Sequence, residues 1–272
     1  MHDSARVCHP EMLTTVEATV EAAAQALRAA RRVVVTTGAG MSRDSGIPTF
    51  RDALTGLWAR YDPEELATEA AFRRNPARVF GWYVWRRRLV RAAVPHAGYH
   101  ALVALERIVA ELVVVTQNVD GLHGRVGSTR VVELHGSLER FSCLEARHPF
   151  PSDQVATPEV DGEVEPPRCG RCGAPVRPDV VWFGEALPPE ASAAAWDWSA
   201  RCDAMLVVGT SGLVQPAAQL PLIAREAGAT VIEINPEPTE ISRAAHITCR
   251  GAAGTVLPAL LAAFTKREGE RP

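Results

Sequence analysis

The stretch VVVTTGAG, residues 33–40, joins a short run of β-branched residues to a glycine-rich break. Three further runs have the same form: LVVVTQNVD (112–120), MLVVGTSG (205–212) and TVIEINPE (230–237). Apolar runs without alternation are typical of strands that are buried on both faces, as in a parallel sheet covered by helices. The four runs therefore predict the centre of a parallel sheet, with a polar segment at the carboxyl end of each strand.

The segments between these runs have the helical period. We expect helices over 14–31, 100–111, 216–227 and 255–264, and a fifth strand at RVVELHG, residues 130–136. Alternation of strands and helices predicts an α/β fold with a Rossmann-type, doubly wound parallel sheet. Ligands of such folds bind at the carboxyl ends of the strands, where the polar breaks of this sequence lie.

Two segments do not follow the alternation. Residues 55–95 are helical, aromatic and rich in arginine, whereas residues 143–178 contain cysteines, prolines and an acidic stretch typical of a solvated loop. We interpret both as insertions that together form a small second domain. The Rossmann-type domain then comprises residues 1–54, 96–142 and 179–272.

The composition excludes several classes of protein. The chain has 272 residues, a net charge of −3 and a pI of about 6.3, whereas proteins that bind duplex DNA usually carry a positive excess. No apolar run reaches the ~18–20 residues of a membrane span, and the N-terminus lacks a signal pattern. We therefore expect a cytoplasmic protein with no nucleic-acid or membrane partner. The oligomeric state stays open.

Gly38 and Gly40 directly follow the first predicted strand. Glycine here lets the backbone approach a pyrophosphate. However, the third glycine of the dinucleotide pattern G-x-G-x-x-G is replaced by Arg43, and no acidic residue follows about 20 positions later to hold a ribose. From these residues alone a tight turn and a dinucleotide site are equally good interpretations, and an ordinary dehydrogenase fits poorly.

Other polar residues lie at the ends of the strands. Gln117, Asn118 and Asp120 follow the second strand, where amide groups can bind a ribose or a carboxamide and Asp120 can orient them. His135 ends the fifth predicted strand, so its imidazole can reach the same crevice. Histidine is the usual general base near neutral pH; the alternative is a hydrogen-bonded structural histidine.

Six motifs occur in order along the chain: GAGMSRDSGIPTFR (38–51), TQNVDGLH (116–123), LHG (134–136), VVWFGE (180–185), GTSGLVQPAA (209–218) and INPE (234–237). Together they resemble the sirtuins, the family of NAD-dependent protein deacylases, over most of the chain. The resemblance implies a Rossmann-type domain with a small domain made of a helical insertion and a zinc-ribbon-like insertion. It also implies that an acyl group passes from a protein lysine to ADP-ribose while nicotinamide is released.

The same resemblance implies roles for individual residues. His135 would be the general base, and Asn118 and Asp120 would place the ribose and the nicotinamide. The implied NAD-binding residues are Gly38, Ala39, Gly40, Ser42, Gly46, Ile47, Phe50, Arg51, Trp58, Gln117, Asn118, Asp120, Gly209, Thr210, Ser211, Asn235, Glu237 and Ala253. An extended substrate peptide would pair as an added strand with the segment that contains Val181, Phe183, Gly184 and Glu185.

CGRCG, residues 169–173, is a C-x-x-C knuckle typical of metal ribbons. Sirtuins normally carry a second C-x-x-C upstream, but here only its first cysteine, Cys143, is present, and the position of its second cysteine is occupied by Ala146. A structural zinc would therefore have three thiolate ligands, from Cys143, Cys169 and Cys172. The fourth ligand can be His148, Glu145 or water. Alternatively, the metal has been lost and hydrophobic packing holds the ribbon.

The sequence GWYVWRRRL, residues 81–89, predicts a helix on which Tyr83 and Arg86 share one face. A phenol and a guanidinium together suit a carboxylate; the alternative is a solvated basic face with the tryptophans packed on the core. Arg87 and Arg88 are expected to face solvent.

Sirtuins that remove acidic acyl groups have a Tyr-x-x-Arg pair at this point, with a small residue after the Phe-Arg of the NAD loop, here Ala53. The resemblance therefore predicts that Tyr83 and Arg86 bind the carboxylate of succinyl- or malonyl-lysine. Two other functions stay open: a sirtuin that acts mainly as a deacetylase or ADP-ribosyltransferase, and a non-catalytic NAD-sensing or scaffold protein.

Overall fold

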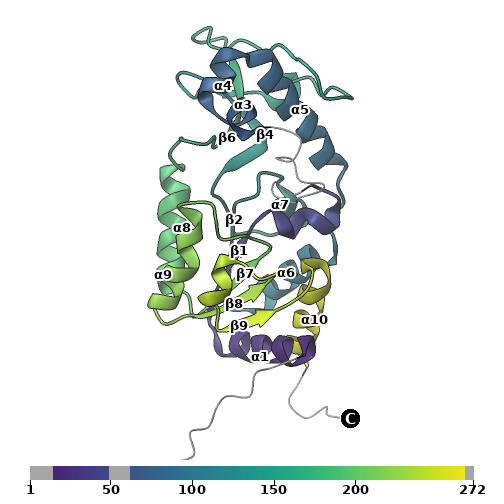
Figure 1. Cartoon of the computed structure of the whole chain (residues 1–272), viewed down its shortest axis with the longest axis vertical. Helices are drawn as coiled ribbons and strands as arrows, with labels where there is room; N and C mark the ends of the chain where they lie inside the picture. Colours follow the sequence, from purple (N-terminus) through teal and green to yellow (C-terminus); the bar gives the residue numbers. More distant parts are fainter. Residues whose placement is uncertain (1–14, 49–61, 267–272) are drawn as a thin grey trace, which may run out of the picture.

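The computed structural model describes residues 15–48 and 62–266, and it is built around a six-stranded sheet (Figure 1). Its strands are β1 (Arg32–Thr37), β2 (Glu111–Thr116), β3 (Val131–Glu133), β7 (Ala204–Val208), β8 (Thr230–Ile234) and β9 (Ile247–Cys249). They lie in the order β3-β2-β1-β7-β8-β9, and every neighbouring pair is parallel. The chain therefore winds outward in both directions from β1 and β7, which confirms the predicted doubly wound sheet.

Helices cover both faces of this sheet because successive residues of each strand point to opposite sides. Val33 and Val35 pack in a core with α1 (Val16–Ala29), α6 (Ala97–Ile108) and α10 (Ala253–Thr265). Val34 packs instead in a core with α8 (Pro189–Arg201) and α9 (Leu220–Glu226). Figure 1 shows these two groups of helices on either side of the strands.

Helix α8 has no counterpart among the expected helices. Its sequence is PEASAAAWDWSAR, and only Ala195 and Ser199 of the helix are fully buried. A helix that buries alanine and serine shows no apolar stripe in its sequence, because the helical period is carried by small residues. The other expected helices are present, with ends shifted by a few residues.

The smaller part of the molecule combines three helices with a second sheet. The helices are α3 (Pro63–Leu66), α4 (Glu69–Arg74) and α5 (Pro76–Ala92), and the antiparallel strands are β4 (Gly136–Cys143), β5 (Pro149–Phe150) and β6 (Val176–Val180). These elements share a third core. Within residues 15–48 and 62–266 there is also a short helix, α7 (Leu122–Arg125), and four 3-10 helices: η1 (Ala39–Ser45), η2 (Ser152–Gln154), η3 (Ala217–Gln219) and η4 (Glu240–Arg243). The residue boundaries proposed above for two domains stay a prediction.

Helix α5 contains the aromatic and arginine-rich stretch, and it is buried on nearly all sides. Arg88 is exposed as expected, but the prediction that Arg87 faces solvent is wrong, because its side chain is only 1% exposed. Its guanidinium donates to Glu139 Oε2 at 3.2 Å and to the carbonyl of Ser152 at 3.0 Å, and it lies over the ring of Phe141. Strand β4 and the segment that follows it therefore cover this side of α5.

The acidic loop covers another side of α5. Arg78 forms a two-pronged ion pair with Asp161, at 2.7 and 3.1 Å, and the amide of Val164 donates to the carbonyl of Ala77. A Cβ added at Gly81 would lie 1.9 Å from the carbonyl oxygen of Gly162, so only glycine fits there. The loop is mostly exposed but anchored to the helix. None of the helices in 15–48 and 62–266 is long and apolar enough to cross a membrane.

Candidate active site

A cavity of about 530 Å³ lies between the carboxyl edge of the parallel sheet and the segment that follows β6. The residue that directly follows each of four strands lines this cavity: Gly38 follows β1, Gln117 follows β2, Gly209 follows β7 and Asn235 follows β8. This is the position at which doubly wound sheets bind ligands, beside the point where the strand order reverses. The polar breaks of the sequence are therefore brought together as expected.

Most residues that the sequence predicts for the site line this cavity. On the sheet side they are Gly38, Ala39, Gly40, Gln117, Asn118, His135, Gly209, Thr210, Ser211, Asn235, Glu237 and Ala253. On the side of the smaller part they are Tyr83, Arg86, Val181, Phe183, Gly184 and Glu185. Four predicted residues lie outside the lining: Ser42, Gly46, Ile47 and Asp120. Phe50, Arg51, Ala53 and Trp58 lie outside the described residues.

The glycines of the first motif are required by close backbone packing. A Cβ added at Gly40 would lie 2.8 Å from the Cα and carbonyl oxygen of Gly209, and Gly209 itself has a φ of +61°. The amide of Gly40 donates to the carbonyl of Gly209 at 2.8 Å. The loops after β1 and β7 thus lie against each other and form a cradle of bare backbone, which suits a ligand as extended as a dinucleotide.

Asn118 and Asp120 belong to one buried hydrogen-bond network. The Asn118 amide nitrogen donates to the carbonyl of Gly38 at 3.0 Å and to Ser42 Oγ at 2.9 Å. Ser42 in turn donates to Asp120 Oδ2 at 2.5 Å, and Asp120 Oδ1 accepts from the amide of Leu122. Burial raises the pKa of Asp120, and the bond from Ser42 opposes that shift. Asp120 therefore acts on the cavity through Ser42 and Asn118.

Two further residues, Tyr99 and His123, belong to these buried contacts, and the sequence did not indicate a role for either. The Tyr99 hydroxyl lies 2.9 Å from Ser42 Oγ, and its ring packs on His123. His123 Nε2 lies 3.1 Å from Thr37 Oγ1, and burial lowers the pKa of His123 to about 3. The sequence carries no signal for Tyr99, because a tyrosine on the apolar face of a helix resembles any other core residue.

His135 lies in the turn between β3 and β4 and lines the cavity. The expectation that it ends a strand is wrong, since β3 ends at Glu133. Its Nδ1 lies 3.0 Å from the carbonyl oxygen of Gln117, and because a carbonyl only accepts, Nδ1 carries the proton. Burial lowers the pKa of His135. The imidazole is therefore neutral near pH 7, with Nε2 as its proton acceptor.

Tyr83 and Arg86 lie at the other end of the cavity, on one face of α5 as predicted. Both are buried, with 4% and 7% exposure. The Arg86 guanidinium lies 4.6 Å from the ring centre of Trp82 and 5.6 Å from that of Tyr83. Burial raises the pKa of Tyr83 to about 12 and lowers that of Arg86. A proton donor and a cation in so apolar a site favour an anionic group strongly.

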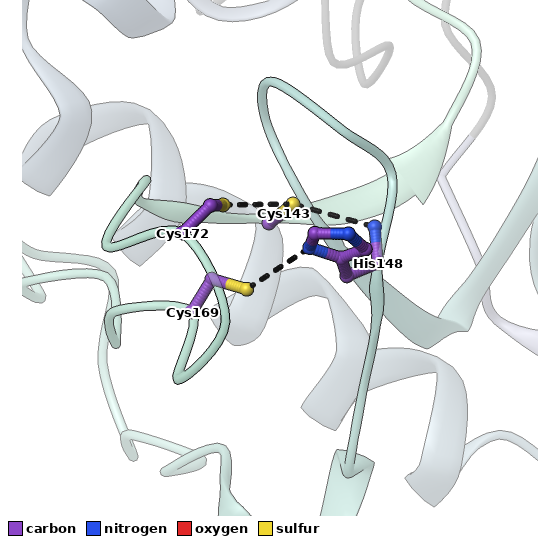
Figure 2. Close-up of side chains that lie close together, drawn as sticks. All are labelled: Cys143, His148, Cys169 and Cys172. Atoms are coloured by element: carbon purple, nitrogen blue, oxygen red, sulfur yellow. Dashed lines mark hydrogen bonds between the residues drawn. The ribbon is translucent and has the colours of Figure 1, made fainter.

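The cysteine knuckle lies outside the cavity. Figure 2 shows its two cysteines beside Cys143 and His148. Donor atoms of Cys143, His148, Cys169 and Cys172 all lie within 4.8 Å of one another. The Sγ atoms of Cys143 and Cys172 are 3.7 Å apart, and Cys169 Sγ is 3.5 Å from His148 Nδ1. Tetrahedral zinc, with bonds of ~2.3 Å to sulfur and ~2.0 Å to nitrogen, separates such ligand pairs by about 3.8 and 3.5 Å. The donor set therefore fits zinc in both chemistry and spacing.

Among the alternatives for the fourth ligand, Glu145 is engaged elsewhere. Its carboxylate is exposed and pairs with Arg73 at 2.8 Å. The chain turns at Arg147, which has a φ of +52°, and this turn directs His148 back toward the thiolates. The geometry therefore favours His148 over Glu145.

Comparisons with known proteins agree with this architecture. The Sir2 family profile matches residues 38–216. The "NAD-dependent protein deacylase 1" of Pseudomonas aeruginosa is 51% identical over 245 residues, which cover 89% of this chain and 98% of that protein. A Sir2 homolog–NAD complex has 42% identity and a TM-score of 0.81, with 90% of this chain and 93% of that chain covered. Sir2Af2 bound to a myristoylated histone peptide has 35% identity and a TM-score of 0.71, with 91% and 97% covered. The chain therefore belongs to the Sir2 family.

Proposed function

We propose that this chain, an NAD-dependent protein deacylase of the Sir2 family, prefers protein lysines that carry acidic acyl groups such as succinyl and malonyl. The observation that carries the proposal is the buried pair of Tyr83 and Arg86 at the end of the cavity. An acetyl or longer alkyl group carries no negative charge that could interact with this guanidinium. A succinyl or malonyl carboxylate would accept hydrogen bonds from both side chains.

NAD occupies the sheet side of the cavity in this proposal. The backbone cradle of Gly38, Gly40 and Gly209 would hold the diphosphate, and Asn235 and Glu237, which also line the cavity, would bind the adenosine ribose. Both protons of the Asn118 amide are used within the described part of the chain, so its oxygen is the atom that accepts from the nicotinamide carboxamide. NAD supplies a ribose carbon from which nicotinamide departs when the acyl oxygen of the substrate attacks.

His135 acts as the general base on the ribose. Its Nδ1 is committed to Gln117, so the proton of a ribose hydroxyl passes to Nε2. With NAD bound, the acyl group would then move to the deprotonated hydroxyl while the lysine amine leaves. One water molecule would be consumed, and the products would be lysine, nicotinamide and O-acyl-ADP-ribose. The low pKa that burial gives His135 keeps the base unprotonated at neutral pH.

The acyl-lysine peptide enters beside the segment of Val181, Phe183, Gly184 and Glu185, which lines the cavity next to Tyr83. The peptide bound to Sir2Af2 supports a peptide as the substrate class. A structural zinc held by Cys143, His148, Cys169 and Cys172 would tie the knuckle to β4 and the turn after it. We retain the sequence prediction of a cytoplasmic location.

The direct test measures nicotinamide release with acetyl- and succinyl-lysine peptides of identical sequence, with and without NAD. We expect NAD-dependent turnover with both and a higher kcat/KM with the succinyl peptide. A higher kcat/KM with the acetyl peptide would leave the deacylase in place and refute the acidic preference. No nicotinamide release with either peptide would favour the non-catalytic alternative.

A further inference from the structure

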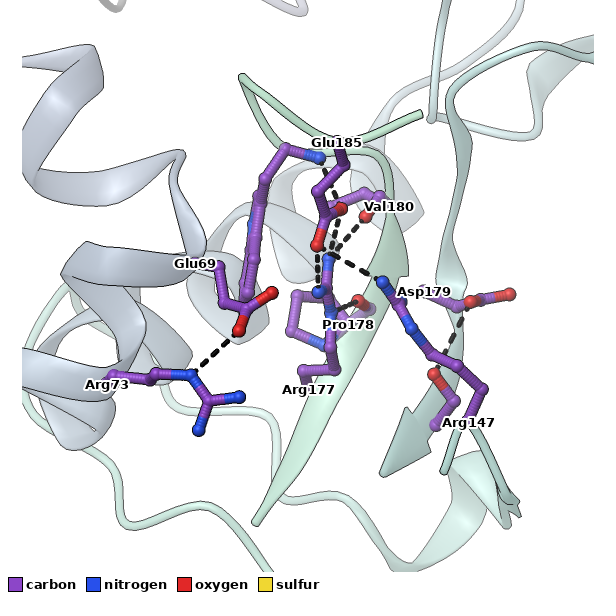
Figure 3. Close-up of polar contacts among 10 residues, drawn as sticks. Glu69, Arg73, Arg147, Arg177, Pro178, Asp179, Val180 and Glu185 are labelled. Atoms are coloured by element: carbon purple, nitrogen blue, oxygen red, sulfur yellow. Dashed lines mark hydrogen bonds and ion pairs between the residues drawn. The ribbon is translucent and has the colours of Figure 1, made fainter. Parts of the chain in front are cut away.

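A buried ion pair joins Arg177 of β6 to Glu185 beside the acyl end of the cavity (Figure 3). The Arg177 side chain has 0% exposure, and that of Glu185 has 14%. The guanidinium donates two hydrogen bonds to the carboxylate, one through Nη1 and one from Nη2 to Oε2 at 2.9 Å. Glu185 lines the cavity and Arg177 does not. Any effect of Arg177 on a ligand therefore passes through its neighbours.

The same guanidinium holds the backbone between the two partners. Arg177 Nη2 donates to the carbonyl of Val180 at 2.7 Å, and Nε donates to that of Pro178 at 3.3 Å. Glu185 holds the same segment at a further point, because its Oε2 also accepts a hydrogen bond from the amide of Trp182 at 2.9 Å. Every nitrogen of one buried side chain is thus engaged in fixing the course of residues 178–185.

Trp182 connects residues 178–185 to the end of the cavity where Tyr83 and Arg86 lie. The Arg177 guanidinium carbon lies 3.4 Å from the centre of the Trp182 ring. The ring also packs on Phe72 and Tyr83, at centroid distances of 5.2 and 6.3 Å. A flat guanidinium can stack on an indole and form a two-pronged bond to a carboxylate at once, whereas a lysine ammonium cannot. The planar group of Arg177 therefore locates the ring that backs Tyr83.

We propose that Arg177 is a positioning residue that sets the binding of the acyl-lysine peptide through Trp182 and Glu185. The proposal rests on the proposed function, because it requires that the peptide binds along residues 181–185. Loss of the guanidinium leaves the Glu185 carboxylate without its inner partner and Trp182 without its stacking surface. Among the described residues, the side-chain hydrogen bonds and ring contacts of Arg177, Trp182 and Glu185 are with α4, α5, β6 and the segments that follow β4 and β6. We therefore expect NAD binding to stay unchanged.

The test uses the full-length chain and steady-state kinetics, with KM measured separately for the acyl peptide and for NAD. Arg177→Met is expected to raise the peptide KM at least about tenfold, with the NAD KM within about twofold of wild type. Arg177→Lys keeps the buried charge but not the stacking, and its peptide KM is expected to lie between those of wild type and Arg177→Met. The control is Arg147→Gln, which removes an exposed partner of Glu185 at 3.1 Å and should leave both constants within about twofold.

Circular dichroism and NAD binding by calorimetry show whether each variant is folded. If Arg177→Met does not fold, the lysine variant decides, since it keeps the positive charge beside Glu185. A folded Arg177→Lys protein with the wild-type peptide KM would overturn the proposal, as would equal rises in the KM values of peptide and NAD. Each variant is assayed with both acetyl and succinyl peptides. Failure of the acidic preference would appear in the wild-type ratio of the two peptides, whereas failure of this proposal would appear as an unchanged peptide KM.

Discussion

The imidazole Nδ1 of His135 lies 3.0 Å from the backbone carbonyl oxygen of Gln117, the residue that directly follows β2. This contact fixes both the tautomer and the orientation of the ring, because the carbonyl can only accept. It also links the proposed base to the end of β2, where the residue after Gln117, Asn118, binds Gly38 and Ser42. One turn of chain after β2 therefore positions the proposed base and the proposed nicotinamide contact together.

Activity should rise with pH at a midpoint below the ordinary histidine value. Burial lowers the pKa of His135 from 6.5, so the ring is protonated, and inactive as a base, only at more acidic pH. We expect the acid limb of kcat/KM for the acyl peptide to have its midpoint below 6.5. His135→Ala should reduce kcat about 10²–10⁴-fold and remove this limb. An acid limb retained in a slow His135→Ala enzyme would assign the titration to another group.

Arg86 should discriminate between acyl groups. Arg86→Met is expected to lower kcat/KM for the succinyl peptide by tens to a hundredfold, because a buried charged hydrogen bond contributes ~1.5–3 kcal/mol. The acetyl peptide has no carboxylate, so its kcat/KM should change little. The matched control is Arg88→Met on the same helix, where the side chain is exposed. Equal losses with both peptides would show that Arg86 supports the fold and does not select the acyl group.

The parallel sheet and the edge that binds ligands could be predicted from the sequence, because both depend on local patterns. Strands β1, β2, β7 and β8 each contain a short apolar run, and each ends at a glycine or polar break that the structure brings to the cavity. Burial of a charged residue follows no such pattern, since it depends on a partner elsewhere in the chain. Arg87 was expected in solvent because nothing in the sequence identifies its partner, Glu139, which lies on β4. Arg177 gave no signal for the same reason: Glu185 reaches it only after the chain turns around Trp182.

The fourth metal ligand shows a second limit of sequence reasoning. His148 and Glu145 both lie within a few residues of Cys143, so spacing alone left them as alternatives. The exclusion of Glu145 depends on Arg73, which comes from a helix in the other insertion and binds its carboxylate. Competition between partners that are distant in sequence therefore favours His148 as the proposed fourth ligand.

Purified protein should contain one zinc ion per chain. The Cys143–Cys172 and Cys169–His148 separations already equal those of a tetrahedral site. Cys169→Ala and His148→Ala should each lower the zinc content and the melting temperature, whereas Glu145→Gln should change neither. Elemental analysis with thermal unfolding checks this. A metal-free wild-type protein with unchanged stability in chelator would refute the zinc site, and zinc lost on Glu145→Gln would move the fourth ligand to that residue.

Gly81→Ala should destabilise the smaller part of the molecule. The added methyl group would lie 1.9 Å from the carbonyl oxygen of Gly162, so the acidic loop must shift and the contacts of Asp161 with Arg78 are weakened. Such overpacking commonly costs about 1–3 kcal/mol. The control is Gly124→Ala in α7, where an added Cβ meets nothing within 4 Å. Chemical unfolding compares the two variants. Equal stabilities of Gly81→Ala and Gly124→Ala would mean that the loop does not pack on α5 in solution, and Tyr83 and Arg86 would then lie on a helix with one side open.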